Sequence, residues 1–373
     1  MSPFLQETES FKHTPLSGWH KIHGGRLVPF AGWEMPLQYA SGPVAEHHLV
    51  RRGAGLFDVS HMGRFDVSGK RAGEFLDFVL SADISGMEEF QSGYALICRE
   101  DGGILDDVFV YRQAAERYRV VVNASNAERD LAWFRRHAES FQIEVRDISA
   151  QSAMIAFQGP RALDMLSVCI RDFTAPRRFF WGMYSIAGSE CMIARTGYTG
   201  EDGVEIITPA GKAVEIWEAL LNMGAEPVGL AARDSLRFEA GFPLYGHELF
   251  EEVTPVEAGV LWACDFSKNF IGRDAIAARK SEGAEKKLVT FVMVEKSVAR
   301  EGYAVMDEAG QIIGGVTSGM LAPTLNVFAG NAFVRREYAN TGQAVYISIR
   351  GAGKKAELVK RPLYIPAYRG KPS

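Results

Sequence analysis

Cysteine is scarce in this sequence of 373 residues, and so are groupings of residues that bind metals. The four cysteines stand far apart and form no C-x-x-C pair, which argues against a zinc site or a disulfide framework and is typical of a reducing compartment. The histidines do not cluster either, because the adjacent His47 and His48 diverge on a helix and His61 is isolated. We therefore expect no metal site.

Long apolar runs are also missing, and none approaches the length that spans a membrane. Residues 1–13 are polar and lack the apolar core of a secretory signal. The net charge of -5 gives no global attraction to nucleic acid or to an anionic membrane. Walker A, G-x-G-x-x-G and G-x-S-x-G motifs do not occur, so a phosphate-loop, nicotinamide or serine-hydrolase function has no support. We expect a cytoplasmic protein that binds neither nucleic acid nor membranes.

The composition that remains is that of a compact soluble protein, with 47% hydrophobic and 23% charged residues. The chain is too long for one ordinary core, which predicts two or three domains. A polar stretch at residues 280–287 (KSEGAEKK) is the best boundary. Beyond it the pattern indicates strands alone, which favours a small antiparallel barrel or sandwich. These strands are expected at 288–294, 311–316, 332–334 and 344–349.

Strands and helices alternate clearly between residues 64 and 149. Residues 72–80 carry apolar side chains along one helical face, and Ser125 with Glu128 matches a capping box at the start of a second helix. The order predicts an α+β arrangement with helices on one face of an antiparallel sheet. The expected strands are 64–68, 94–98, 104–111, 118–123 and 143–145. By contrast, residues 18–39 indicate irregular or short-strand structure.

The first motif that could take part in catalysis or binding is GGILDDVFVY, residues 102–111. Alternation along a strand sends Asp106 and Asp107 to opposite faces, so only one of them can point into a given pocket. A carboxylate in an apolar setting must be paired, titrate high or serve a cation. The alternative is a hairpin turn, because D-G-G followed by acidic residues is ordinary turn chemistry.

Two further motifs point to a ligand with a planar polar edge. In RTGYTGEDGVEI (195–206), the glycines allow close approach of the backbone, Tyr198 offers a flat face, and Glu201 can accept two parallel hydrogen bonds. An exposed glycine-rich hairpin is the alternative. In GLAARDSLRFEAGFPLYGHEL (229–249), Arg233 and Arg237 share a helix face and could meet a carboxylated ligand, although this motif alone favours an ordinary helix with an intrahelical pair between Asp234 and Arg237.

Taken together, ten segments resemble blocks of the glycine cleavage T-protein (aminomethyltransferase) family, in the order of that family. No single block would identify it, but ten in order over nearly the whole length do. The blocks lie at residues 30–39, 46–63, 102–111, 121–134, 156–162, 195–206, 232–241, 254–259, 270–276 and 314–325.

The resemblance implies a three-domain cloverleaf of α+β class. Domain 1 would be discontinuous, formed by residues 1–55 and 150–279, and would bind folate. Domain 2, residues 56–149, would be ferredoxin-like, and domain 3, residues 280–373, would be an antiparallel β-barrel. The folate would lie in a central channel between the three.

The resemblance also implies roles for individual residues. Asp106 matches the essential aspartate of the family, and Glu201 matches the glutamate that holds the pterin edge. The other positions expected to contact folate or substrate are Tyr94, Tyr198, Arg233, Arg300 and Tyr368. Departures from the family pattern occur beside the channel, where GLAAR replaces GLGAR and TSGMLAPTL replaces TSGTFSPTL, and around residues 261–269. They put details of the pocket in doubt.

The implied reaction transfers the methylene carbon of an aminomethyl group on lipoylated H-protein to tetrahydrofolate, the co-substrate, and releases ammonia. Two alternatives stay open. One is a folate-dependent demethylase of a small methylated substrate, weakened by the intact GGILDD and RTGYTGEDG blocks. The other is a non-catalytic folate-binding module, of which one relative carries K-G-C-Y-x-G-Q-E where this chain has NFIGRDAI without a cysteine.

Overall fold

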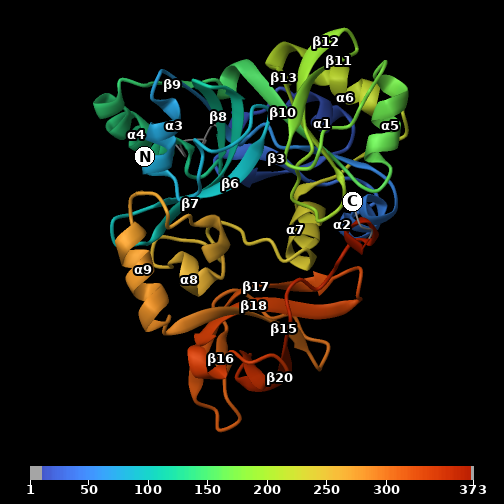
Figure 1. The fold of residues 1–373 in the computed structure, drawn as a ribbon. Coiled ribbons are helices and arrows are strands. Elements are labelled where there is room, and N and C mark those ends of the chain that lie inside the picture. Colours follow the sequence, from blue (N-terminus) through green and yellow to red (C-terminus); the bar gives the residue numbers. More distant parts are fainter. Residues whose placement is uncertain (1–10, 371–373) are drawn as a thin grey trace, which may run out of the picture.

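The computed structural model describes residues 11–370, arranged as three lobes around a central space (Figure 1). Most of the N-terminal segment discussed above, residues 1–13, lies outside this range. Two sheets with their helices form the upper lobes in Figure 1, and a closed barrel forms the lower lobe. Helix α7 (Leu230–Glu239) lies between the lobes, near the centre of the molecule.

The first lobe is built on a six-stranded sheet in the order β11-β12-β13-β10-β4-β14. All seven residues of its strand β10 are buried, because helices cover both faces of the sheet. Helices α1, α5 and α6 contribute to the core on one face, and α2 and α7 to the core on the other. The elements are α1 (Ser17–Ile22), α2 (Pro43–Arg52), β4 (Gly55–Asp58), β10 (Ser152–Gln158), α5 (Ala162–Cys169), β11 (Trp181–Ile186), β12 (Ser189–Ala194), β13 (Gly203–Pro209), α6 (Ala213–Leu221) and β14 (Glu226–Pro227).

The second lobe is a five-stranded antiparallel sheet in the order β6-β7-β8-β5-β9. Without its edge strand β6, the succession β5-α3-β7-β8-α4-β9 is the ferredoxin-like arrangement. Phe75 of α3 and Phe134 of α4 are fully buried in one core with strand residues such as Phe65. The elements are β5 (Gly63–Ser68), α3 (Ala72–Val79), β6 (Ser92–Cys98), β7 (Ile104–Ala114), β8 (Arg117–Val122), α4 (Ala127–Ala138) and β9 (Glu144–Asp147).

The third lobe is a closed barrel in the order β15-β18-β17-β16-β19-β20, which confirms the expected antiparallel barrel. Strands β16 and β20 were not expected from the sequence. Only the middle of the polar stretch 280–287 forms a connection between elements, which is shorter than predicted. Helix α9 continues to Glu282, and β15 begins at Lys286. The strands of the barrel are β15 (Lys286–Met293), β16 (Ala304–Met306), β17 (Ile312–Ala322), β18 (Val327–Arg335), β19 (Ala344–Ile349) and β20 (Ala352–Val359). Helices α8 (Pro255–Ala258) and α9 (Arg273–Glu282) precede the barrel and share a separate core with β6, β7 and β18.

The segment 18–39 contains most of α1 and two short strands, β2 (Arg26–Phe30) and β3 (Trp33–Gln38), and β3 also pairs with β1 (Lys12–His13). The short strands expected there are confirmed. One local expectation was wrong. The capping box at Ser125 does not form, because α4 begins at Ala127 with Asn126 as its N-cap and without a side-chain capping bond. The amide of Asn126 instead donates to Asp106, 2.7 Å away.

No helix among residues 11–370 combines the length and the apolar character needed to cross a bilayer. The expected domain limits, at 55/56, 149/150 and 279/280, stay a prediction.

Candidate functional site

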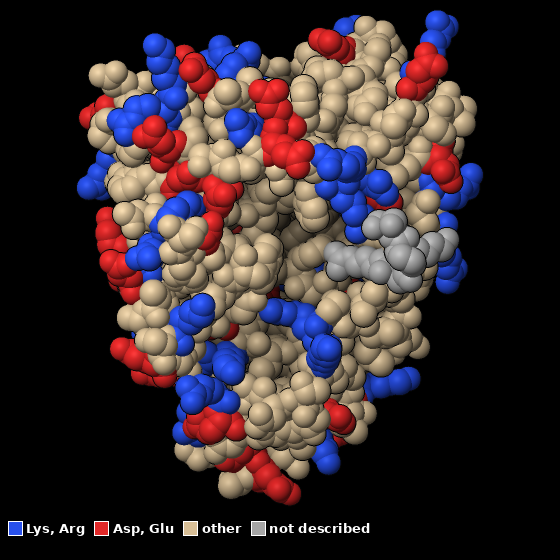
Figure 2. Space-filling view, viewed as in Figure 1, with Lys and Arg blue, Asp and Glu red and all other residues tan. Residues whose placement is uncertain are grey.

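A cavity of about 1050 Å³ opens where the three lobes meet, and it is the deep hollow in the centre of Figure 2. Its wall is mostly apolar, with a few convergent polar groups, which is the usual character of a site for an organic ligand. The lining comes from β2 and β3, from β6, β7 and β8, from the loop before β13, from α7 and the segment after it, and from β17.

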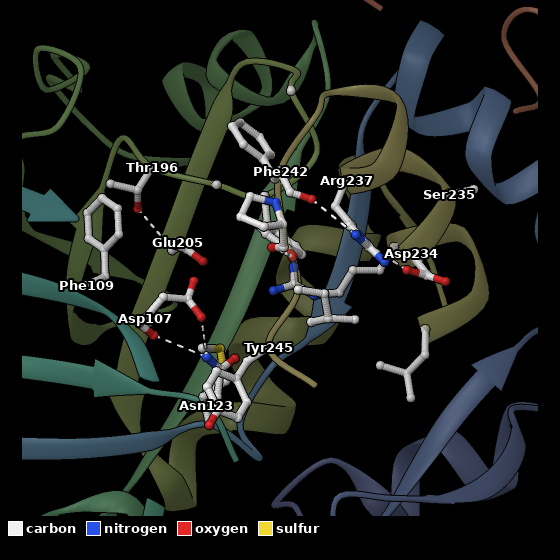
Figure 3. Close-up of a pocket in the computed structure, with 18 of the residues that line it drawn as sticks. Asp107, Phe109, Asn123, Thr196, Glu205, Asp234, Ser235, Arg237, Phe242 and Tyr245 are labelled. Carbon is white, nitrogen blue, oxygen red and sulfur yellow. Dashed lines mark hydrogen bonds and ion pairs between the residues drawn. The ribbon is translucent and has the colours of Figure 1, made fainter. Parts of the chain in front are cut away.

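The paired carboxylates of β7 point in opposite directions, as strand alternation requires. Asp107 shares the cavity-facing side with Phe109 and lines the cavity (Figure 3). Asp106 is fully buried on the other side, between the sheet and α4, and does not line the cavity. The expected placement of Asp106 in the ligand site therefore needs correction, because the helices of this lobe cover its face of the sheet.

Asp107 accepts a hydrogen bond from a side-chain amide, and its surroundings disfavour the ionised form of its carboxyl group. Nδ2 of Asn123 donates to its Oδ1 over 2.8 Å (Figure 3). Tyr94 lies close to the carboxylate, but its hydroxyl makes no hydrogen bond within residues 11–370. Burial, together with the neighbouring charge of Asp106, raises the pKa of Asp107 to about 7. A carboxylate with this pKa can change its protonation state at physiological pH.

Aromatic rings form a flat wall near this carboxylate. Tyr94 stacks on Trp262, with 5.2 Å between ring centroids. Trp262 lies in a short 3-10 helix (Leu261–Ala263) and is 71% exposed, although it also lines the cavity. An exposed tryptophan at a cavity mouth leaves an apolar face free for a ligand.

The glycine-rich loop before β13 supplies the opposite wall. Gly203 has a φ of +153°, and a Cβ there would stand 2.4 Å from the carbonyl oxygen of Phe157, so only glycine fits. Tyr198 donates a short hydrogen bond to the carbonyl of Pro243 and stacks on Phe242. The guanidinium of Arg233 lies 4.9 Å from the centroid of the Tyr198 ring. Its Nη1 is buried and has no hydrogen-bond partner among the described residues.

Glu201 lines the cavity but is not a free carboxylate. Nη1 of Arg51 donates to its Oε1 over 3.0 Å, while Nη2 of the same arginine donates to Oε2 of Glu239 over 3.0 Å. Glu239 also accepts from Thr324 in the β17–β18 turn and contacts His47. The charge at Glu201 is thus set within a buried network that joins α2, α7 and the barrel.

The remaining expected residues differ in position. Tyr368 lines the cavity and donates to the carbonyl of Gly200 over 2.7 Å, which brings the C-terminal segment against the glycine-rich loop. Arg300 is exposed and lies outside the cavity lining, so its expected place in the channel also needs correction. Five expected residues are brought together at the cavity: Tyr94, Tyr198, Glu201, Arg233 and Tyr368.

Several cavity residues were not expected from the sequence. Asn123 stands in the segment VVNASN, as the last residue of the expected strand 118–123, but nothing in its position indicates which carboxylate it contacts. His61 is 7% exposed and lines the cavity, and burial lowers the pKa of its imidazole to about 4. His61 lies in DVSHMG, within the family-like block 46–63, but no other histidine is near it in the sequence, so it was not expected at the site.

Comparison with known proteins identifies the family. The GCVT N-terminal domain model matches residues 16–268, and the glycine cleavage T-protein C-terminal barrel domain model matches residues 286–364. Together these two matches cover most of the chain. It belongs to the glycine cleavage T-protein family. The members compared below carry the name aminomethyltransferase.

Relatives of this family match from end to end. An aminomethyltransferase of Thermoanaerobacter pseudethanolicus is 41% identical over 368 residues, which cover 97% of this chain and all of the relative. One of Clostridium botulinum (strain Kyoto / Type A2) is 41% identical over 364 residues, with 95% and 98% covered. The crystal structure of the glycine cleavage system aminomethyltransferase T of Bartonella henselae superimposes with a TM-score of 0.91 at 34% identity, covering 96% and 99%. The cloverleaf expected for the T-protein family is therefore confirmed.

Proposed function

We propose that this T-protein transfers the methylene carbon of an aminomethyl group, carried on the lipoyl arm of H-protein, to tetrahydrofolate. In this reaction the C–S and C–N bonds of the methylene carbon break, and bonds to N5 and N10 of the folate form. Ammonia and the reduced lipoyl group leave. The observation that carries the proposal is the half-buried carboxylate of Asp107, which projects into a large cavity lined by all three lobes.

Tetrahydrofolate suits the polar and aromatic groups of the cavity. A reduced pterin has a flat ring that can stack on aromatic side chains. The N–H groups along one edge of the ring can donate hydrogen bonds to a carboxylate such as Glu201. Its carbonyl oxygen would satisfy the buried Nη1 of Arg233, which lacks a hydrogen-bond partner within residues 11–370. The glutamyl end carries negative charge, for which Arg178 at the cavity wall is suited.

The chemical difficulty of the reaction is a cation that develops on the nitrogen-bound methylene. A carboxylate fixed in a medium of low dielectric constant stabilises such a cation strongly, and it does so without reorganisation during the step. Asp107 is suited to this task because it lies on a strand and is held by Asn123. It can also accept a proton from a folate nitrogen, since its pKa of about 7 is near the working pH. We accordingly assign to Asp107 the catalytic role that the sequence suggested for Asp106.

The lipoylated H-protein and a cytoplasmic location are further parts of the proposal. The opening of the cavity in Figure 2 admits an extended arm from a carrier protein. A demethylase of a small methylated substrate is the second candidate, and it would use the same carboxylate and the same folate. It differs in that it would neither need H-protein nor release ammonia.

The test is ammonia release from aminomethyl-loaded H-protein, measured with and without tetrahydrofolate. We expect release to require both partners, and Asp107→Asn to reduce turnover by at least a hundredfold while folate still binds. Asp106→Asn is the matched control on the opposite strand face and should lower turnover less. Activity on a free methylamine with no activity on H-protein would favour the demethylase, and full turnover in Asp107→Asn would overturn the assignment of the carboxylate.

A further inference from the structure

Behind Asp107 lies a third carboxyl group that the reaction does not explain. Asp130 is in the first turn of α4 and is only 1% exposed. Neither of its oxygens has a hydrogen-bond donor among the described residues, and Nε of Arg129 stands 3.7 Å from Oδ1. A buried carboxylate without a donor is strongly disfavoured, so this group needs a proton or a partner.

The group in contact with Asp130 is another carboxyl. Asn126, which donates to Asp106, stands one turn before Asp130 on the same face of α4, so the side chain of Asp130 faces the fully buried Asp106. Asp106 already accepts hydrogen bonds from Nδ2 of Asn126 at 2.7 Å, and from Nδ2 and the backbone N–H of Asn123 at 2.8 and 3.0 Å. These donors favour the ionised form of Asp106, whereas Arg129 favours the ionised form of Asp130 less strongly than burial and Asp106 oppose it. Two carboxyl groups in contact cannot both be ionised away from water, so one proton must lie between them.

We propose that Asp130 is a positioning residue that carries this proton and donates it in a hydrogen bond to Asp106, so that Asp106 remains a fixed negative charge behind Asp107. No bond to carbon changes in this arrangement. The proton stays on an oxygen of Asp130, and Asp106 is its acceptor.

The pair is connected to the cavity through a single amide. Nδ2 of Asn123 donates to Oδ1 of Asp106 and to Oδ1 of Asp107, each over 2.8 Å. The negative charge of Asp106 opposes ionisation of Asp107, and this effect is second only to burial in raising the pKa of Asp107. Asp130 therefore acts on the cavity indirectly, since its proton keeps Asp106 charged.

Other charged and titratable groups surround the three carboxyls and must be considered in any pH dependence. Arg129 faces Asp130 and donates to Glu251 over 2.7 Å and to Tyr245 over 3.2 Å. Tyr94 faces Asp107 from β6, and Tyr198 faces it from the glycine-rich loop. The pKa values of both tyrosines are raised above 10, mainly by burial, so they remain neutral across the range in which Asp107 titrates.

Infrared spectroscopy tests the location of the proton without reference to activity. Burial and the charge of Asp106 raise the pKa of Asp130 to about 10, against about 7 for Asp107, so near pH 8.5 only the former should be protonated. The difference spectrum between the native protein and Asp130→Asn should then show one protonated carboxyl band. The same band should persist in Asp107→Asn. Its absence from the difference spectrum would overturn the proposal.

The pH profile of turnover tests the effect on the cavity, and this part rests on the proposed function of Asp107. In Asp106→Asn the acidic limb should move to lower pH by about one unit, because a neighbouring charge is lost. Asp130→Leu should move it in the same direction, since Asp106 without its donor takes up a proton, and Asp130→Asn should restore the native position. If the acidic limb of the Asp130→Leu profile stays at the pH of the native protein, the proposal is overturned. If the residual turnover of Asp107→Asn still shows the acidic limb, Asp107 is not the group that titrates. The infrared result on Asp130 would remain valid in that case.

Discussion

Arg51 and Glu201 form a buried ion pair, with 3.0 Å between Nη1 and Oε1 and about 4% of each side chain exposed. The arginine reaches Glu201 from α2 and continues to Glu239 on α7. Because both carboxylates share one guanidinium, the direction in which Glu201 faces the cavity is fixed before any ligand arrives.

Glu201→Gln should weaken tetrahydrofolate binding by about tenfold or more, because a hydrogen bond to a charged group contributes about 1.5–3 kcal/mol. Arg51 keeps its partner Glu239, so the fold should survive. A titration followed by protein fluorescence measures the affinity. Unchanged affinity would remove Glu201 from the folate site.

Turnover should rise with pH through the pKa of Asp107. Only the ionised carboxylate stabilises a cation, and burial with the charge of Asp106 places this pKa at about 7. The rate under saturating substrates should therefore fall about tenfold for each pH unit below 7. His61 should contribute nothing between pH 5 and 8, because its pKa of about 4 keeps it neutral there. A flat profile from pH 5 to 8 would contradict the assignment.

Asp107→Asn should also stabilise the ligand-free protein above neutral pH. A carboxyl whose pKa rises on folding holds its proton more tightly in the folded state, so stability falls as the pH rises from about 4, the unfolded pKa, through about 7. The amide avoids this cost, which we expect to be about 1–3 kcal/mol at pH 8. Melting temperatures of the two proteins should converge near pH 4 and separate by pH 8. If the two melting temperatures differ equally at pH 4 and at pH 8, ionisation of Asp107 is not the cause of the difference.

The barrel is attached to α7 through a second buried pair, in which Arg237 donates to Glu248 over 2.7 Å. Glu248 also accepts from Thr317 and Ser318 of β17. Glu248→Ala would remove the buried partner of Arg237 and leave it only the exposed Asp234, so it should cost about 3 kcal/mol of unfolding free energy. Asp274→Ala, which removes an exposed partner of Arg273, is the control and should change the melting temperature little. Similar losses in both variants would contradict the role of the buried pair.

The fold could be predicted largely from the sequence because its signals are local. The periodicity of 72–80 and the alternation in 104–111 depend only on neighbouring residues, and α3 and β7 lie there. The wrong start for α4 has a non-local cause. Asn126 is drawn into the network of Asp106, twenty positions earlier, and no local pattern reports that contact.

The site could be predicted only in part, for a similar reason. Alternation established that Asp106 and Asp107 face opposite ways, but both faces of β7 are apolar, with valines on one and aromatic residues on the other. Which face receives a ligand depends on where α4 packs, and this is a tertiary property. Asp130 and Arg51 escaped notice because their partners stand 24 and 150 positions away.

The hydrogen bond from Tyr368 to the carbonyl of Gly200 has a consequence for biosynthesis. A ribosome that has just translated this tyrosine still encloses the C-terminal segment in its exit tunnel, while the first two lobes can already fold outside. The cavity wall at the glycine-rich loop therefore stays open until Tyr368 has left the tunnel, after the first two lobes have emerged. A nascent chain that has not yet released this segment should not hold the ligand of the cavity.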